Sequence, residues 1–148
     1  MTKKQHKNNN RNQVVWILDE CVTQNKNKWE GVLSGNVKSV KELGLLSTKD
    51  AIISKTLDAI ISKGKVVITT NKHPDKCDDY FKISSVQGLI RFSSDMITQP
   101  EQKIYLEKFQ QMVKNKTKLL GKKITLTKNS VIFEEGNKKE VRNYKQYI

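Results

Sequence analysis

One stretch decides the fold: Val14-Val15-Trp16-Ile17-Leu18-Asp19-Glu20. Its five apolar residues, most of them β-branched or aromatic, are typical of a strand buried on both faces inside a parallel sheet. The run ends abruptly at two carboxylates, Asp19 and Glu20. Ligands of open α/β sheets bind just beyond the carboxyl ends of the strands, so this pair stands where a functional site is expected. The ordinary alternative is that Asp19 serves only as a turn or helix-cap residue.

Charge is the most informative property of the composition. Lys and Arg number 28 against 15 Asp and Glu, which gives a formal net charge of +13 over 148 residues. Such an excess favours a polyanionic partner, and nucleic acid before a membrane surface. An AT-rich coding sequence is the alternative source of the many Lys and Asn residues. The apolar residues, 36% of the chain, are clustered, which indicates a globular domain rather than a disordered chain.

The chain is expected to act in the cytoplasm. It has no apolar run long enough to span a bilayer, and its N-terminus is too polar for a signal peptide. The two cysteines, Cys21 and Cys77, provide neither a disulfide framework nor a CxxC motif, which indicates a reducing compartment. We expect Cys21 to be a small buried hydrophobe.

Three regions are predicted along the chain. Residues 1–13 hold four basic and no acidic side chains, and we expect them to form a disordered basic arm. Residues 14–136 hold the apolar segments and form the folded domain. Residues 137–148 are predicted to be a polar C-terminal tail.

Strand and helix patterns alternate through the first two thirds of the domain. Short apolar runs predict further strands at residues 37–40, 65–70 and 88–92, and helical spacing predicts a helix over residues 51–63. This alternation predicts an α/β fold with a mainly parallel central sheet and right-handed crossovers.

The last third of the domain has a different pattern. Thr98, Pro100 and Glu101 have the spacing of a helix start, with a capping residue and a proline in the first turn. Residues 124–126 and 130–134, joined by a short polar turn, then predict a C-terminal β-hairpin.

Polar side chains gather at three places that such a sheet brings to one edge. Asp19 and Glu20 end the first strand, and Asn71 follows the strand at residues 65–70. Asp50 stands in the first turn of the helix between them, where an acid also has the ordinary role of complementing the helix dipole. We therefore expect a polar site at the carboxyl edge of the sheet.

The order of six short motifs resembles a known family. In chain order they are Leu-Asp19-Glu20, Val40-Lys-Glu-Leu-Gly44-Leu, Ser47-Thr-Lys-Asp50, Val67-Ile-Thr-Thr70-Asn71, Gly88-Leu-Ile-Arg91-Phe and Leu120-Gly-Lys-Lys-Ile-Thr-Leu. Their succession over most of residues 14–135 is similar to the small PIN-like nucleases of the Mut7-C and VapC-type toxin group. The resemblance implies a three-layer α/β/α fold, and an active site in which three or four acids hold Mg²⁺ or Mn²⁺ to cut RNA.

The resemblance also implies roles for individual residues. Asp19 matches the acid at the end of the first strand, Glu20 its acidic neighbour, and Asp50 the acid that opens the following helix, so these three are the expected metal ligands. The third site of the family carries an acid where this chain has Asn71, or Lys72 if the register moves by one. Asp19, Asp50 and Asn71 are accordingly the expected catalytic set, with a neutral amide in place of one carboxylate.

Two further groups of residues are expected around this set. Four would support it by positioning a phosphate or a ligand, or by supplying the missing acid: Thr69, Thr70, His73 and Asp75. A lone histidine is more often an ordinary loop residue than a ligand. Four basic residues are expected to contact RNA: Lys72, Arg91, Lys114 and Lys118.

The resemblance leaves two functions open. The first is a metal-dependent endoribonuclease, with an antitoxin as a candidate protein partner and a homodimer as the family's frequent state. The second is a catalytically weakened PIN-like protein that binds RNA or a protein without cutting, which the Asn71 departure favours. A small winged-helix DNA-binding protein fits the charge but not the strands that end in polar clusters.

Overall fold

The computed structural model describes residues 14–33, 35–45, 56–57, 59, 64–70, 86–96 and 98–144. The elements, in chain order, are β1 (Val15–Leu18), η1 (Lys26–Trp29), β2 (Val37–Ser39), β3 (Lys65–Thr70), β4 (Gln87–Phe92), α4 (Gln99–Met112), η2 (Lys116–Leu119), β5 (Lys123–Leu126), β6 (Ser130–Glu135) and β7 (Lys138–Asn143). The elements η1 and η2 are short 3₁₀ helices.

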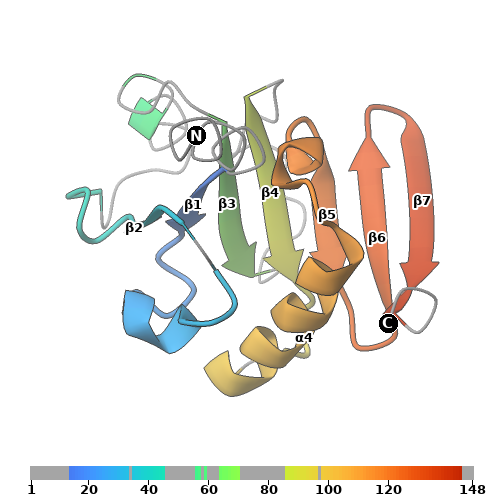
Figure 1. Ribbon diagram of the computed structural model, residues 1–148, viewed down its shortest axis with the longest axis horizontal. Helices are drawn as coiled ribbons and strands as arrows, with labels where there is room; N and C mark the ends of the chain where they lie inside the picture. The colour runs from blue at the N-terminus through green and yellow to red at the C-terminus, as the bar shows by residue number, and fades with distance from the viewer. Residues whose placement is uncertain are drawn as a thin grey trace, which may run out of the picture.

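A single seven-stranded sheet organises the molecule, with the order β2-β1-β3-β4-β5-β6-β7 (Figure 1). Strands β2, β1, β3, β4 and β5 pair in parallel, and β6 and β7 extend the sheet in antiparallel fashion. The predicted α/β class, the mainly parallel sheet and the C-terminal hairpin are therefore confirmed.

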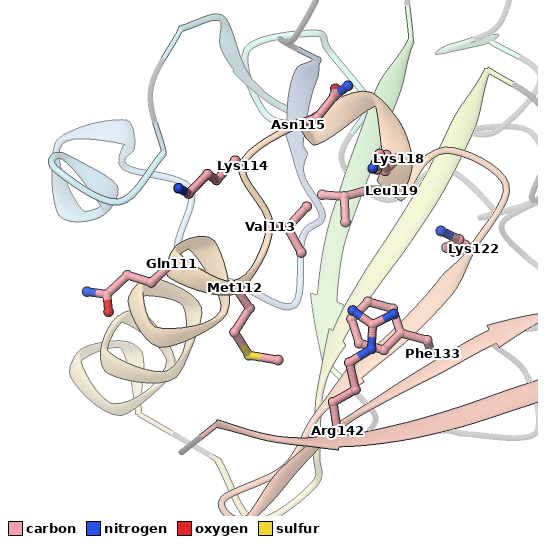
Figure 2. A pocket seen from close by; sticks show the side chains of 10 residues that line it. All are labelled: Gln111, Met112, Val113, Lys114, Asn115, Lys118, Leu119, Lys122, Phe133 and Arg142. Carbon is pink, nitrogen blue, oxygen red and sulfur yellow. The ribbon is translucent and has the colours of Figure 1, made fainter. Parts of the chain in front are cut away.

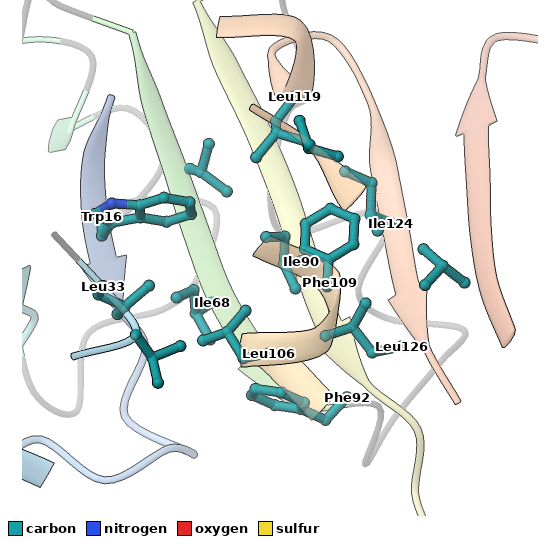
Figure 3. Packing of buried hydrophobic residues seen from close by; sticks show 14 of the residues in the cluster. Trp16, Leu33, Ile68, Ile90, Phe92, Leu106, Phe109, Leu119, Ile124 and Leu126 are labelled. Carbon is teal, nitrogen blue, oxygen red and sulfur yellow. The ribbon is translucent and has the colours of Figure 1, made fainter. Parts of the chain in front are cut away.

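Both faces of the central strands are buried, which explains their unbroken apolar runs. On one face, alternate side chains such as Trp16, Ile68 and Ile90 pack under α4 and under the segment that contains η1 (Figure 3). On the opposite face, the intervening side chains, for example Ile17 and Val67, form a second cluster.

The second face is covered in part by the segment predicted as the helix over residues 51–63. Leu57 is fully buried in its cluster, and Thr56, Leu57 and Ala59 are helical. The remainder of that predicted helix lies outside the described residues. The α/β class is established. Because α4 is the one long helix among the described residues, a three-layer arrangement stays a prediction.

The crossovers do not share one hand. The connection from β1 to β2 and the connection from β4 to β5 both pack on the face that carries Trp16 and Ile90. Yet β2 lies on one side of β1, whereas β5 lies on the other side of β4. Two crossovers on the same face that step in opposite directions have opposite hands, so one is of the rare left-handed kind. The right-handed rule therefore does not hold for every parallel connection of this sheet.

The apolar surface of the sheet gives a reason for this arrangement. The apolar side chains of β5 and β6, including Ile124, Leu126 and Phe133, belong to the same cluster as Leu106 and Phe109 of α4. A helix on the opposite face would leave them exposed to water, so α4 lies where the most apolar area needs burial.

The helix α4 begins where its sequence predicts. Thr98 is the N-cap, with its hydroxyl accepting the Glu101 N–H at 3.4 Å, and Pro100 lies in the first turn. Beyond its last turn, the Lys116 ammonium donates to the carbonyl oxygens of Gln110 and Val113. Burial lowers the pKa of that ammonium, which still places positive charge at the negative end of the helix dipole.

The predicted C-terminal tail is wrong for most of its length. Residues 138–143 form β7, which pairs with β6 after a turn at Gly136, whose φ is +59°. Tyr144 is buried, and its hydroxyl donates to the Thr127 carbonyl at 2.7 Å. A strand at the edge of a sheet pairs through its backbone while its side chains face water, so polar composition did not reveal it.

Candidate functional site

The carboxyl ends of β1 and β3 meet at the point where the strand order reverses. The chain leaves β1 toward β2 on one side, and leaves β3 toward β4 on the other (Figure 1). Ligands of α/β sheets bind at such a reversal. Here Asp19 follows β1 directly, and β3 ends in Thr69 and Thr70.

Asp19 is held in place by the neighbouring strand. Its N–H donates to the Ile68 carbonyl at 3.0 Å, which extends the pairing of β1 with β3 by one residue. Its carboxylate oxygen Oδ2 accepts hydrogen bonds from the Thr69 hydroxyl at 2.7 Å and from the Cys21 thiol at 3.0 Å. The structure thus brings together Asp19 and Thr69, two residues expected at the site.

The second oxygen of the same carboxylate, Oδ1, is buried and has no hydrogen-bond partner among the described residues. Only 4% of the Asp19 surface is exposed. A buried carboxylate oxygen without a partner costs free energy unless a donor or a cation satisfies it. Carboxylate oxygens are also the donors that Mg²⁺ and Mn²⁺ prefer, so Oδ1 fits one position of a divalent cation site.

The other expected ligands do not join Asp19 in the described part of the chain. Glu20 is exposed and lies in the turn that follows β1. Asp50 and Asn71 lie outside the described residues. Within residues 14–144, where described, no group of three or more His, Cys, Asp or Glu side chains is close enough to hold a metal ion. Three more expected residues, Lys72, His73 and Asp75, also lie outside.

Cys21 belongs to the site, although its sequence context suggested only a buried hydrophobe. Its sulfur lies 2.8 Å from the Thr69 hydroxyl and accepts the Thr70 N–H at 3.4 Å. Burial, and then the charge of Asp19, raise the pKa of the Cys21 thiol to about 11. The thiol is therefore protonated at neutral pH and can donate to Asp19. The Val22 N–H donates to the Asp19 carbonyl at 3.1 Å, so the chain turns directly after Asp19 and the Cys21 thiol comes back to its carboxylate.

Gln24 fixes the loop that carries Asp19. Its amide nitrogen lies 2.6 Å from the Asp19 carbonyl, 3.2 Å from that of Leu18 and 3.0 Å from that of Val22. Its amide oxygen accepts the Lys41 N–H at 3.0 Å. One side chain thus ties the exit of β1 to the turn after β2. No sequence pattern predicted this role, because the polar segment after Glu20 looks like any loop.

The turn after β2 is a capped helical turn. The Ser39 hydroxyl accepts the Glu42 N–H at 3.1 Å, and the Glu42 carboxylate accepts the Ser39 N–H at 2.9 Å, which is a capping box. Gly44, with a φ of +72°, closes the turn, and the Leu45 N–H donates to the Val40 carbonyl at 2.8 Å. The motif Val40-Lys-Glu-Leu-Gly44-Leu therefore has a local structural explanation.

Glu42 also contacts the loop after β1. Its carboxylate lies 3.3 Å from the Lys26 ammonium of η1. Desolvation raises the pKa of Glu42, but the Ser39 N–H and the Lys26 charge outweigh it and lower the pKa overall. At neutral pH this carboxylate stays charged and joins the two loops that flank Asp19.

The basic residues expected to contact RNA are spread over the molecule. Arg91 lies within the sheet, where its Nε donates to the Thr125 hydroxyl at 2.7 Å and its Nη2 lies 3.7 Å from Glu134, with 12% of the side chain exposed. Lys114 and Lys118 line a groove beside η2. The carbonyl of Leu119, in η2, lies against Gly88 near the start of β4. That groove is therefore toward the amino ends of the parallel strands, whereas Asp19 is at their carboxyl ends.

No protein-family model, curated protein or solved structure matches this chain. None of the described helices is long and apolar enough to cross a membrane.

Proposed function

We propose that this protein is a metal-dependent endoribonuclease of the PIN-like kind, with Asp19 as its central metal ligand. One observation carries the proposal: one oxygen of Asp19 is fixed by Thr69 and Cys21, while the other is buried and has no hydrogen-bond partner in the part of the chain that the structure describes. This arrangement presents a preoriented carboxylate oxygen at the reversal of strand order, in a chain with a net charge of +13.

Under this proposal Mg²⁺ or Mn²⁺ would be held by Asp19, with Asp50 and Glu20 as the further carboxylates expected from the resemblance. When bound, such an ion activates a water for in-line attack on the phosphorus of an RNA phosphodiester and stabilises the charge that develops. Asn71 would contribute a neutral oxygen in place of an acid.

The residues around Asp19 would orient rather than react. Thr69 and Cys21 hold the carboxylate, and Gln24 holds the loop, so Oδ1 keeps its direction when the ion is exchanged. Thr70, His73 and Asp75 are proposed to support the phosphate or the metal from the end of β3. An antitoxin or other protein partner, and a homodimer, are part of the same proposal.

A second candidate function is RNA binding without cleavage. The described residues contain no group of three or more His, Cys, Asp or Glu side chains that could hold a metal ion. The chain also has Asn71 where the family pattern has an acid. A site with less negative charge holds two metal ions poorly, which favours retention of binding over catalysis.

Cleavage of a mixed RNA pool distinguishes these functions. Wild type, Asp19→Asn and Asn71→Asp are incubated with Mn²⁺, with Mg²⁺ and with EDTA. Since changes around a metal already cost about 10–100-fold, the Asp19→Asn variant is expected to lose at least that much activity. Glu30→Gln is the matched control, because it removes one exposed carboxylate from the same loop and should cut like wild type.

Thermal unfolding of each variant accompanies the assay. Asp19→Asn removes a buried charge, so the fold is expected to be retained. Activity in Asn71→Asp but not in wild type would establish the binding function instead. If no variant cuts with either metal, the nuclease proposal is wrong.

A further inference from the structure

A basic groove lies between the end of α4, η2 and the β6–β7 hairpin (Figure 2). Its volume is about 500 Å³, which is room for one nucleotide-sized ligand. Three lysines line it, Lys114, Lys118 and Lys122, together with Arg142 and Phe133. Asp19 belongs to the opposite edge of the sheet, so this groove is separate from the candidate active site.

The lysines of the groove are available to an anion. Lys114 and Lys118 are exposed, and neither forms an ion pair with any described residue. Lys122 is close enough to Glu140 to lower the pKa of that carboxyl, although the Arg142 hydrogen bond is the larger cause. Glu135 and Glu140 line an adjoining hollow with Lys122 and Arg142, but Lys138 and Lys139 line it too, so cations outnumber acids among the described residues there and the groove carries an excess of positive charge.

Arg142 forms a planar surface in the same groove. Its Nε and Nη2 lie 2.8 Å and 2.9 Å from the two oxygens of Glu140, a two-point contact that fixes the guanidinium plane. The guanidinium carbon lies 4.6 Å from the centroid of the Phe133 ring. Figure 2 shows the two side chains against one another. The Arg142 side chain remains 31% exposed, so a second planar group can stack on it.

We propose that this groove binds single-stranded nucleic acid, with one base stacked on Arg142 and the neighbouring phosphates on Lys114 and Lys118. The combination of a fixed guanidinium plane with surrounding lysines selects this partner, because stacked bases of a duplex have no free face to offer. An acidic peptide would use the lysines but not the plane.

This groove deepens the proposed function. That the bound strand is RNA rests on the proposed function. It adds a place where the substrate is held away from the point of cleavage. Binding can be measured in EDTA without any cutting, so the two proposals can fail separately.

The test is fluorescence anisotropy with a short labelled single-stranded RNA in EDTA. The variant K114A/K118A is expected to bind on the order of tenfold more weakly at low salt. Its slope of log affinity against log salt should be shallower by about 1.4, since each phosphate contact on a single strand contributes about 0.7. The control K28A/K38A loses the same charge at the β2 side of the sheet, opposite β7, and should stay within about twofold of wild type.

Stacking is tested by R142K, which keeps the charge and loses the plane. It is expected to weaken RNA binding several-fold while leaving unchanged the weaker binding of an abasic oligonucleotide of equal length. Equal losses of RNA affinity in K28A/K38A and K114A/K118A would overturn the proposal that the groove binds RNA, because affinity would then depend only on net charge. Equal effects of R142K on RNA and on the abasic strand would overturn the stacking.

The pattern of results also separates this proposal from the nuclease. If K114A/K118A binds RNA normally and D19N loses cleavage, the nuclease proposal stands and the proposal that the groove binds RNA is wrong. If K114A/K118A binds RNA more weakly but no form of the protein cuts RNA, the groove proposal stands and the nuclease proposal is wrong.

Discussion

At Asp19 the two oxygens of one carboxylate have different surroundings, and this difference is the basis of the functional argument. Oδ2 receives the Thr69 hydroxyl and the Cys21 thiol, whereas Oδ1 is buried without a partner among the described residues. If this carboxylate only capped a turn, its second oxygen would accept a hydrogen bond from a backbone N–H. Here the Val22 N–H donates instead to the main-chain carbonyl of Asp19, at 3.1 Å, which leaves Oδ1 for another ligand.

The thiol of Cys21 offers a test of this arrangement. In a Cys77→Ser background, the rate of alkylation by iodoacetamide is expected to be slow at neutral pH and to reach half its maximum near pH 11, because burial and the Asp19 charge raise the thiol pKa to about 11. Adding Asp19→Asn should move the profile to lower pH, since the repelling charge is gone. A wild-type midpoint at the ordinary value of 9.0 would contradict the contact.

The same pKa has a consequence for stability. A thiol whose pKa rises from 9.0 to about 11 on folding stabilises the folded state fully below pH 9.0 and loses that contribution as the pH rises to about 11. Urea unfolding across this range should therefore show a decline in the free energy of unfolding that Cys21→Ala lacks.

At the scale of elements, η2 packs closely on the sheet through its backbone. A Cβ on Gly88 would lie 2.2 Å from the carbonyl oxygen of Leu119, and the Gly121 N–H donates to the Gln87 carbonyl at 3.2 Å. The segment between α4 and β5 thus meets β4 through backbone, which requires a residue without a side chain at position 88.

Two Gly→Ala substitutions test this contact. Gly88→Ala is expected to cost about 1–3 kcal/mol of unfolding free energy, because rigid backbone must move. Gly64→Ala is the matched control: its new Cβ would meet only the end of the flexible Leu120 side chain, at 2.6 Å, so the loss should be smaller. Urea denaturation measures both, and equal losses would mean that η2 does not press on β4.

At the scale of the whole molecule, the sheet continues past its parallel strands to an edge that holds the last helix in place. Tyr144 packs against Tyr105 of α4 with ring centroids 5.6 Å apart, and Arg142 covers Phe133. The segment after Gly136 therefore joins the hairpin to the helix layer, and it also supplies one wall of the basic groove.

A chain that ends at Gly136 should show what this edge contributes. We expect a lower melting temperature and concentration-dependent association, because the backbone of β6 and the side chain of Phe133 would become exposed. RNA binding should fall as well, since Arg142 is removed. A chain that ends at Tyr144 keeps every contact named above and should match the full chain in thermal unfolding and light scattering. Equal behaviour of the two truncations would contradict the role of β7.

Local patterns in the sequence were sufficient for much of the fold. The apolar run before Asp19, the alternation of strands with helical spacing, and the Thr98 cap each depend on residues within a few positions of one another, so they could be predicted without the structure. The same holds for the expectation that a polar site lies at the carboxyl edge of the sheet, because parallel strands place their ends together.

Tertiary structure decided the rest, because the contacts involved join residues far apart in the chain. Asp19 meets Thr69 across a separation of 50 residues, and only the register of β1 on β3 sets that distance. The face chosen by α4, the pairing of the polar strand β7 and the separation of Lys118 from Asp19 all follow from where apolar area and backbone hydrogen bonds can be satisfied in three dimensions. No short window of sequence contains that information.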